Sequence, residues 1–241
     1  MTTLLAFDTA TERMSIALAA RGRVWLHEAI GGAQASATLI PAIFVLLADA
    51  GIGLADLDAI AFGRGPGAFT GLRTACSVAQ GLAFGATKPV LPIDTLLAVA
   101  EDARQGDARQ SVWVAMDARM NEIYAAHYAY EDGRWTTLVA PFLARLDDLT
   151  DRWAGEPAQV VAGSALAAFP GLQTGNARRA LDAAPRAEAM LPLAKVLWRE
   201  GGAVDPALAL PLYVRDKVAQ TTAEREAAKA AKDLALEPAA R

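Results

Sequence analysis

The chain of 241 residues contains one cysteine, two histidines and no long apolar run. Because Cys76 is alone, neither an intrachain disulfide nor a cysteine zinc cluster can form. His27 and His127 are too far apart in sequence for the helical HExxH or HxxxH metal pairs. The longest apolar stretch, residues 39–48, falls far short of the roughly 20 residues that a membrane helix needs. We therefore expect a cytoplasmic protein with no membrane association.

Positive charge is also scarce. The net charge is −4 and the isoelectric point is near 5.3, which excludes a basic module that binds nucleic acid by charge alone. The N-terminus has no basic segment and Asp8 interrupts its apolar run, so it is not a signal peptide. Hydrophobic residues make up 54% of the chain, which is ample for a buried core.

Residues 1–106 show the hydrophobic patterns of three strands followed by three helices that alternate with two further strands. Asp94 stands where it would cap the third helix, and Gly51 closes the first. The expected strands are 4–8, 14–20, 24–30, 59–62 and 90–93, and the expected helices are 37–50, 70–85 and 95–105.

The beginning of this pattern recurs about 110 residues later. A strand at 112–116 ends at Asp117, as the first strand ends at Asp8, and an alternating segment at 122–130 follows it. Two such lobes describe an α/β protein with the duplicated ribonuclease-H-like fold of the actin-like ATPase superfamily. We assign 1–106 to an N-terminal lobe that carries the partner interface and 107–216 to a second, degenerate lobe. Further elements are expected at 145–153, 159–162 and 185–200, and 217–241 is an Ala/Lys/Glu-rich tail in which Thr221 and Glu224 begin a solvated helix.

Actin-like ATPases hold nucleotide between the lobes with two hairpin turns rich in Gly, Ser and Thr, because backbone N–H groups must approach the phosphates closely. The corresponding turns here, 8–13 and 117–121, contain no glycine. In an ancestral site of this kind Asp8 and Asp117 would bind a metal; the alternative, which we favour, is that each hydrogen-bonds its own turn. An ATP-dependent kinase or ATPase of this superfamily is the alternative function.

The glycine-rich segment 63–73 joins a strand to a helix. It is not a phosphate-binding P-loop, because no lysine follows its last glycine in any register. Its glycines favour a sharp, close-packed turn over an anion site.

The two helices on either side of this region carry little charge. Residues 74–87 contain no charged side chain, and Gly81 in mid-helix indicates close approach of another backbone. Two such helices predict a helix-to-helix interface with another protein, and burial of both inside the chain's own core is the alternative. The expected interface residues are Ser36, Leu39, Ala42, Ile43, Val45, Phe69, Leu72, Arg73, Cys76, Ala79 and Gln80.

A hydrolase is disfavoured. The candidate nucleophiles Ser36, Ser77, Ser111 and Ser164 do not lie in a GxSxG elbow, and a triad would need a histidine from a hairpin strand. Cys76 is expected to be an inert packed thiol.

Four motifs resemble the TsaB (YeaZ) family and run in the family's order across nearly the whole chain. They are Leu5-Ala-Phe-Asp-Thr9, Gly65-Pro-Gly-Ala-Phe-Thr-Gly-Leu-Arg73, Met116-Asp-Ala-Arg119 with Glu122-Ile-Tyr124, and Pro211-Leu-Tyr-Val-Arg215. One departure is Ala35-Ser36, where the family often has His-Ser.

The resemblance implies a non-catalytic accessory subunit for threonylcarbamoyl-adenosine (t6A) modification of tRNA. Its paralogue TsaD would transfer the threonylcarbamoyl group to adenosine 37 of tRNAs that read ANN codons. The resemblance further implies pairing with TsaD through the first two helices, association of the ATPase TsaE with that pair, and a homodimer through the same surface when the chain is alone. Contact with tRNA would occur only through the complex. No catalytic residue, cofactor site or metal site is expected on this chain.

Overall fold

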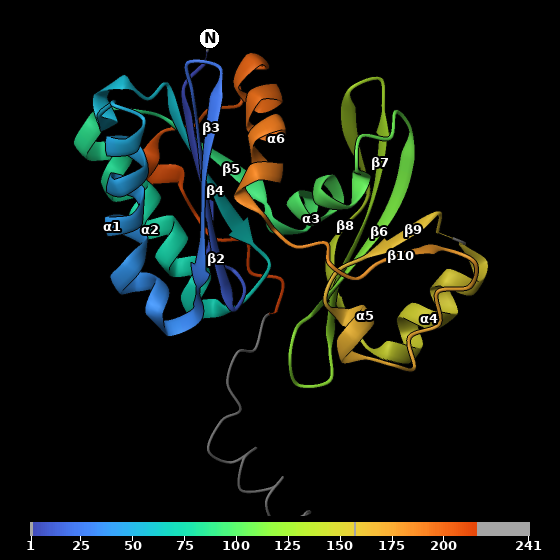
Figure 1. The fold of residues 1–241 in the computed structure, drawn as a ribbon. Coiled ribbons are helices and arrows are strands. Elements are labelled where there is room, and N and C mark those ends of the chain that lie inside the picture. The colour runs from blue at the N-terminus through green and yellow to red at the C-terminus, as the bar shows by residue number, and fades with distance from the viewer. Residues whose placement is uncertain (1, 157, 216–241) are drawn as a thin grey trace, which may run out of the picture.

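The computed structural model describes residues 2–156 and 158–215. Two lobes lie side by side, each built on a five-stranded sheet (Figure 1). The first sheet has the order β3-β2-β1-β4-β5 and the second has the order β10-β9-β6-β7-β8. The helix expected to begin at Thr221 lies outside the described residues.

The strands of the first sheet are β1 (Leu4–Asp8), β2 (Arg13–Ala20), β3 (Arg23–Ile30), β4 (Ala59–Gly65) and β5 (Val90–Asp94). Those of the second are β6 (Gln110–Asp117), β7 (Ile123–Glu131), β8 (Arg134–Ala144), β9 (Val160–Ala162) and β10 (Arg178–Ala180).

The two sheets share one topology. In each, the first strand pairs antiparallel with the next strand and parallel with the fourth. This repetition confirms the duplicated ribonuclease-H-like fold. The sequence analysis missed β10, because its three residues lie at a sheet edge and include the exposed Arg178 and Arg179, so they show no apolar alternation.

Helices cover both faces of both sheets. Helices α1 (Ala35–Asp49) and α2 (Phe69–Ala86) pack on one face of the first sheet, and α6 (Ala187–Arg199) packs on the other. The second sheet lies between α3 (Thr95–Arg104) on one side and α4 (Leu146–Gly155) with the short α5 (Ala165–Ala168) on the other. Single turns of 3-10 helix occur at η1 (Gly32–Gln34), η2 (Leu54–Asp56) and η3 (Pro206–Leu208).

Two helices are exchanged between the lobes. Helix α3 follows the first sheet in sequence but packs on the second, where Leu96 and Val99 contact Val114 and its neighbours. Helix α6 lies within 107–216, yet it packs on the first sheet, where Met190 joins the same apolar cluster as Leu4. The pair therefore stands between the two sheets and packs together there (Figure 1).

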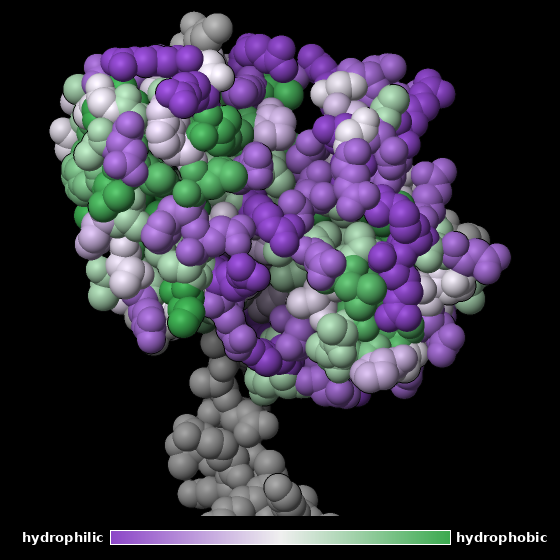
Figure 2. Space-filling model, in the orientation of Figure 1, coloured by the Kyte–Doolittle hydropathy of each residue, from purple (hydrophilic) through white to green (hydrophobic). Residues whose placement is uncertain are grey.

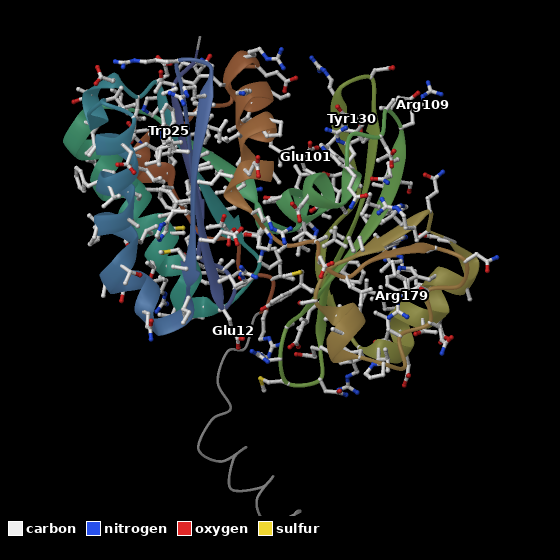
Figure 3. All side chains as sticks on the ribbon, viewed as in Figure 1. Glu12, Trp25, Glu101, Arg109, Tyr130 and Arg179 are labelled. Atoms are coloured by element: carbon white, nitrogen blue, oxygen red, sulfur yellow. The ribbon has the colours of Figure 1, made fainter. Side chains whose placement is uncertain are left out.

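A buried polar contact also joins α3 to the second sheet. Glu101 of α3 lies near Tyr130 of β7 (Figure 3). Its carboxylate accepts a hydrogen bond from Trp135 Nε1 at 2.7 Å and pairs with Arg104 at 2.7 Å, and the Arg104 guanidinium lies 4.2 Å from the centre of the Tyr130 ring. Both charges are thus partnered where α3 enters the interlobe region.

The last described segment returns to the first lobe. Val204 forms an isolated antiparallel bridge with Val90 of β5, and Leu212 N–H donates to the Arg64 carbonyl at 2.7 Å. Residues 202–215 therefore run along the first lobe and end between the lobes.

One expected cap is not made. Asp94 stands at the N-cap of α3, but its side chain makes no capping hydrogen bond. It pairs instead with Arg64, with 2.5 Å between Nε and Oδ1. Within residues 2–156 and 158–215, no helix has both the length and the apolar character needed to cross a bilayer.

The exchange of α3 predicts that the two lobes unfold together. Leu96 is fully buried, so Leu96→Ala should lower the free energy of unfolding by about 2–4 kcal/mol. The measurement is urea unfolding followed by far-UV circular dichroism and by tryptophan fluorescence, to which the buried Trp113 and Trp153 of the second lobe contribute. Both signals should shift to the same lower midpoint. Separate midpoints for the two signals would contradict the expected coupling.

Candidate partner interface and the two aspartate turns

The first aspartate turn is closed by its own hydrogen bonds. Asp8, at the end of β1, is almost fully buried. Its Oδ1 accepts from Ala10 N–H at 2.7 Å and its Oδ2 accepts from the Thr95 hydroxyl at 2.8 Å. Burial raises the pKa of Asp8 to about 6, because removal of the carboxylate from water outweighs these two hydrogen bonds. The expectation that Asp8 hydrogen-bonds its own turn is confirmed.

The second turn is closed in the same way. Asp117 Oδ1 accepts from Arg119 N–H at 2.8 Å, and Ser164 Oγ accepts from Asp117 N–H at 3.0 Å. The Arg119 side chain pairs with Asp117 and also with Glu12 of the first turn. Glu12 lies at the end of the first lobe that faces this hairpin (Figure 3). Asp117 therefore also hydrogen-bonds its own turn, as expected, and Arg119 links the two turns.

The glycine-rich segment packs directly on the first turn. A Cβ at Gly63 would lie 1.8 Å from Asp8 Oδ2, and one at Gly71 would lie 1.9 Å from the Thr9 carbonyl oxygen. The Thr9 hydroxyl donates to the Gly71 carbonyl at 2.7 Å. These glycines therefore allow close packing of the chain on itself, as the sequence analysis expected.

The structure brings one serine and one histidine together. Ser111 Oγ lies 2.6 Å from His127 Nε2, and the His127 ring stacks on Trp113 at 4.5 Å. Burial lowers the pKa of His127. Among the described residues, the imidazole ring of His127 is hydrogen-bonded to Ser111 alone, so the pair lacks the third, orienting group of a catalytic triad. Across residues 2–156 and 158–215, no three His, Cys, Asp or Glu side chains form a group that could hold a metal ion.

The residues expected at the partner interface fall into three groups. Leu39, Ile43, Leu72, Cys76 and Ala79 are buried in the first lobe. Ala42, Phe69 and Gln80 are half-buried, while Ser36, Val45 and Arg73 are exposed. The buried group supports the two helices from within, so only the other two groups and their exposed neighbours are accessible at the surface. Burial also raises the pKa of the Cys76 thiol to about 12, which fits an inert packed thiol.

The exposed side of these helices is largely apolar. We call it the helical face and define it by Ile40, Phe44 and Val45 of α1 with Ser77, Gly81 and Phe84 of α2. Val45 is 58% exposed and Phe84 is 59% exposed, so the alternative that both helices lie wholly inside the core is wrong. In Figure 2, apolar groups gather on the side of the first lobe where α1 lies, whereas the second lobe shows mainly hydrophilic groups.

The interface residues expected from the sequence do not include the exposed Ile40, Phe44 and Phe84. Their spacing could have shown them, because Ile40 and Phe44 are four residues apart and each directly follows a buried residue, Leu39 or Ile43. The expected close approach to Gly81 is not found within the chain, since a Cβ there would have no neighbour within 4 Å. The glycine therefore opens onto the molecular surface.

Residues from the end of the described chain border α2. Arg73 stacks over the Phe69 ring, 3.6 Å from its centre, and its Nε donates to the Tyr213 hydroxyl at 3.1 Å. Gln80 Nε2 donates to the Ala209 carbonyl at 3.2 Å. Leu208 and Leu210, which flank Ala209, are exposed next to α2.

Comparison with known proteins assigns the family. Residues 26–172 match a family model described as TsaD, tRNA N6-adenosine threonylcarbamoyltransferase. The tRNA threonylcarbamoyladenosine biosynthesis protein TsaB of Haemophilus influenzae is 35% identical over 224 residues, which is 90% of this chain and 94% of the relative. The chain belongs to the TsaB family. The protein of the same name from Escherichia coli is 36% identical over 90% of this chain and 96% of its own length.

A solved structure of the TsaB family has the same fold as this chain. YeaZ from Pseudomonas aeruginosa superposes with a TM-score of 0.80 at 36% sequence identity. The superposition covers 88% of this chain and all of that structure. The similarity in sequence and the similarity in fold therefore agree on the same family.

The buried carboxylate makes stability depend on pH. The folded state holds the Asp8 proton more tightly than the unfolded state, whose pKa is near the ordinary 3.8. The contribution of Asp8 to stability should therefore fall as pH rises from about 4 to 6, by on the order of 3 kcal/mol in total. Above that window its contribution should stay constant. Asp8→Asn does not titrate, so its free energy of unfolding relative to the wild type should rise across this window. Urea unfolding of both proteins between pH 4 and 8 measures this, and a constant difference at every pH would contradict it.

Proposed function

We propose that this chain is a non-catalytic subunit of the complex that forms t6A at position 37 of tRNAs reading ANN codons, where it binds and activates a TsaD-type transferase. The observation that carries the proposal is the exposed apolar helical face. The names of the relatives and the match to the TsaD family model support the pathway and the partner. A TsaE-type ATPase joins the assembly, and tRNA is reached only through the complex.

The helical face has the chemistry of a protein contact. Four large apolar side chains, Ile40, Phe44, Val45 and Phe84, stand in water on the isolated chain. Their burial against a partner is favourable by roughly 25 cal/mol for each Å² removed from water. On α2, Ser77 and Gly81 precede Phe84 at helical spacing and present little or no side chain, which lets a facing helix approach closely. When the chain is alone, the same face supports a two-fold homodimer, in which each copy offers the same surface.

The two aspartate turns support a non-catalytic role. Asp8 and Asp117 are both engaged with their own turns, and Asp8 is held where burial favours its neutral form. An actin-like ATPase needs these positions for nucleotide and metal, which makes the ATPase the weaker of the two functions. By linkage, a subunit that binds the active conformation of its partner more tightly than the resting one raises the active population by the ratio of those affinities.

Val45→Glu tests the face. The change places an unpaired carboxylate in a contact that would otherwise exclude water, which costs several kcal/mol and is enough to abolish a micromolar complex worth about 8 kcal/mol. Leu138→Glu is the matched control, because Leu138 is 52% exposed on β8 of the second lobe. The measurements are affinity for the cognate TsaD-type protein, sedimentation of the isolated chain, and t6A formation by the reconstituted complex.

Val45→Glu should remove partner binding, self-association and t6A formation, while Leu138→Glu should keep all three. Circular dichroism confirms folding of both variants. A folded Val45→Glu protein that still binds its partner and supports t6A synthesis would refute this surface. A folded Asp8→Asn protein that joins the complex but yields no t6A would instead show a catalytic role for this chain.

Gly81→Ala separates stability from binding. Within the chain the added methyl meets open space, and alanine is favoured over glycine in a helix, so the chain, at a dilution where it is monomeric, should gain about 0.5–1 kcal/mol of stability. The same methyl should hold a facing helix away and weaken partner binding. Thermal unfolding of the isolated chain and calorimetric titration with the partner measure the two effects. A variant that is more stable and binds equally well would remove Gly81 from the contact.

A further inference from the structure

Three of the four family-like motifs meet at one pocket between the lobes. The pocket has a volume of about 190 Å³ and is lined by parts of three segments, 66–72, 118–124 and 212–215. The first follows β4 and begins α2, the second is the hairpin after β6, and the third is the end of the described chain. The proposed function assigns no role to this pocket.

The size of the pocket restricts what can enter it. Pockets that enclose a whole cofactor or drug-sized molecule have volumes of about 300–1,000 Å³. This pocket is smaller and has room for a single side chain of a protein.

The lining of the pocket is mainly apolar. Phe69, Leu72 and Leu212 contribute to its walls, together with the rings of Tyr124 and Tyr213. The Phe69 and Tyr213 rings lie 5.3 Å apart, and Arg73 holds both, through its stacking on Phe69 and its hydrogen bond to Tyr213. These walls are therefore in place before anything binds.

The charges at the pocket are already paired. Arg119 pairs with Glu12 and Asp117, and Arg215 pairs with Glu122 at 2.7 Å. Arg215 also donates to the Ala118 carbonyl at 2.9 Å, which fixes the hairpin that forms one wall. Both lining guanidiniums thus have carboxylate partners, although Arg215 Nε is buried without a hydrogen-bond partner in the described part of the chain. With the positive charges paired and the walls mainly apolar, the pocket favours an apolar group over an anion.

The pocket is continuous with the helical face. Exposed or half-exposed positions of α2 follow one another at helical spacing from Phe69, which lines the pocket, through Arg73 and Ser77 to Gly81 and Phe84. A protein that lies along this side of α2 therefore reaches the pocket at the N-terminal end of the helix.

We propose that the pocket receives one apolar side chain of the TsaD-type partner when that partner docks on the helical face. The inference rests on the proposed function and adds a specific anchor to it. A small, preformed apolar pocket at the edge of an interface is the type of site that an anchoring side chain fills. The anchor fixes the register of the partner along α2, which an apolar face alone does not do.

Filling the pocket from within tests the proposal. Ala68 lines the pocket, is exposed, and stands at the N-cap of α2, so a larger side chain there does not disturb the core. Ala68→Phe occupies the apolar space and Ala68→Glu places a charge beside it. Thr70→Phe is the matched control, because Thr70 is exposed two residues later and does not line the pocket.

Calorimetric titration of the full-length variants with the cognate TsaD-type protein gives the decisive comparison. Both Ala68 variants should weaken binding at least about tenfold, and Thr70→Phe should change it by less than about twofold. Sedimentation should show unchanged self-association for all three, and circular dichroism verifies folding. Unaltered partner binding by folded Ala68→Phe and Ala68→Glu proteins would overturn the anchor, even if Val45→Glu still abolished binding and so upheld the proposed function.

Two other occupants give different results. Weaker self-association with intact partner binding in the Ala68 variants would assign the pocket to a second copy of this chain and overturn the proposal. Thermal stabilisation of the wild type by inorganic phosphate, absent in Ala68→Phe, would show an anion site and likewise overturn it. If the Ala68 variants and Val45→Glu all kept partner binding, the proposed function itself would be refuted.

Discussion

The geometry of the first lobe depends on the hydrogen bonds of the buried Asp8 carboxylate. The carboxylate accepts a hydrogen bond from the Thr95 hydroxyl, and Thr95 Oγ1 in turn accepts one from Gly65 N–H at 3.1 Å. This chain of hydrogen bonds joins the ends of β1 and β4 to the start of α3. Because Gly63 has no side chain, β4 can lie directly against the carboxylate, and the segment that follows must turn sharply into α2. The direction of α2, and hence the exposed face it shares with α1, follows from this packing.

In this actin-like fold both aspartate turns are closed by contacts within the chain. In this chain the two aspartates close their own turns, and the glycines lie under the first turn. Hydrogen-bond donors that could have faced a ligand are used to hold β1, β4 and α3 together. A chain with these contacts is suited to present a fixed surface to a partner.

Sequence reasoning identified the repeat because a strand ending in aspartate, followed by an alternating hairpin, is a local pattern that survives divergence. It also singled out α1 and α2, since a lack of charge is visible without coordinates, and their role as an interface stays a prediction. It could not tell which of their side chains face outward. Periodicity shows that a helix has two faces, but uncharged residues such as Ala79 and Phe84 look alike until packing buries one and exposes the other.

Other features depended on contacts distant in sequence. The pocket unites segments about 50 and 90 residues apart, and no local pattern predicts that they meet. The placement of α6 on the first sheet was equally hidden, because its apolar stripe fits either sheet. Asp94 shows the limit of local rules. It stands at the N-cap of α3, but its side chain forms an ion pair with Arg64 and makes no capping hydrogen bond.

The exchange of α3 and α6 has a consequence for how this protein can be recombined. Each sheet is covered on its inner side by a helix encoded in the other repeat. Suppose that a chimera takes one whole repeat from a relative and keeps the other. Both of its sheets are then covered by a helix from the other parent, because α6 covers the first sheet and α3 covers the second. The natural unit of exchange is a sheet together with the helix that covers it, and the two parts of that unit are not adjacent in the gene.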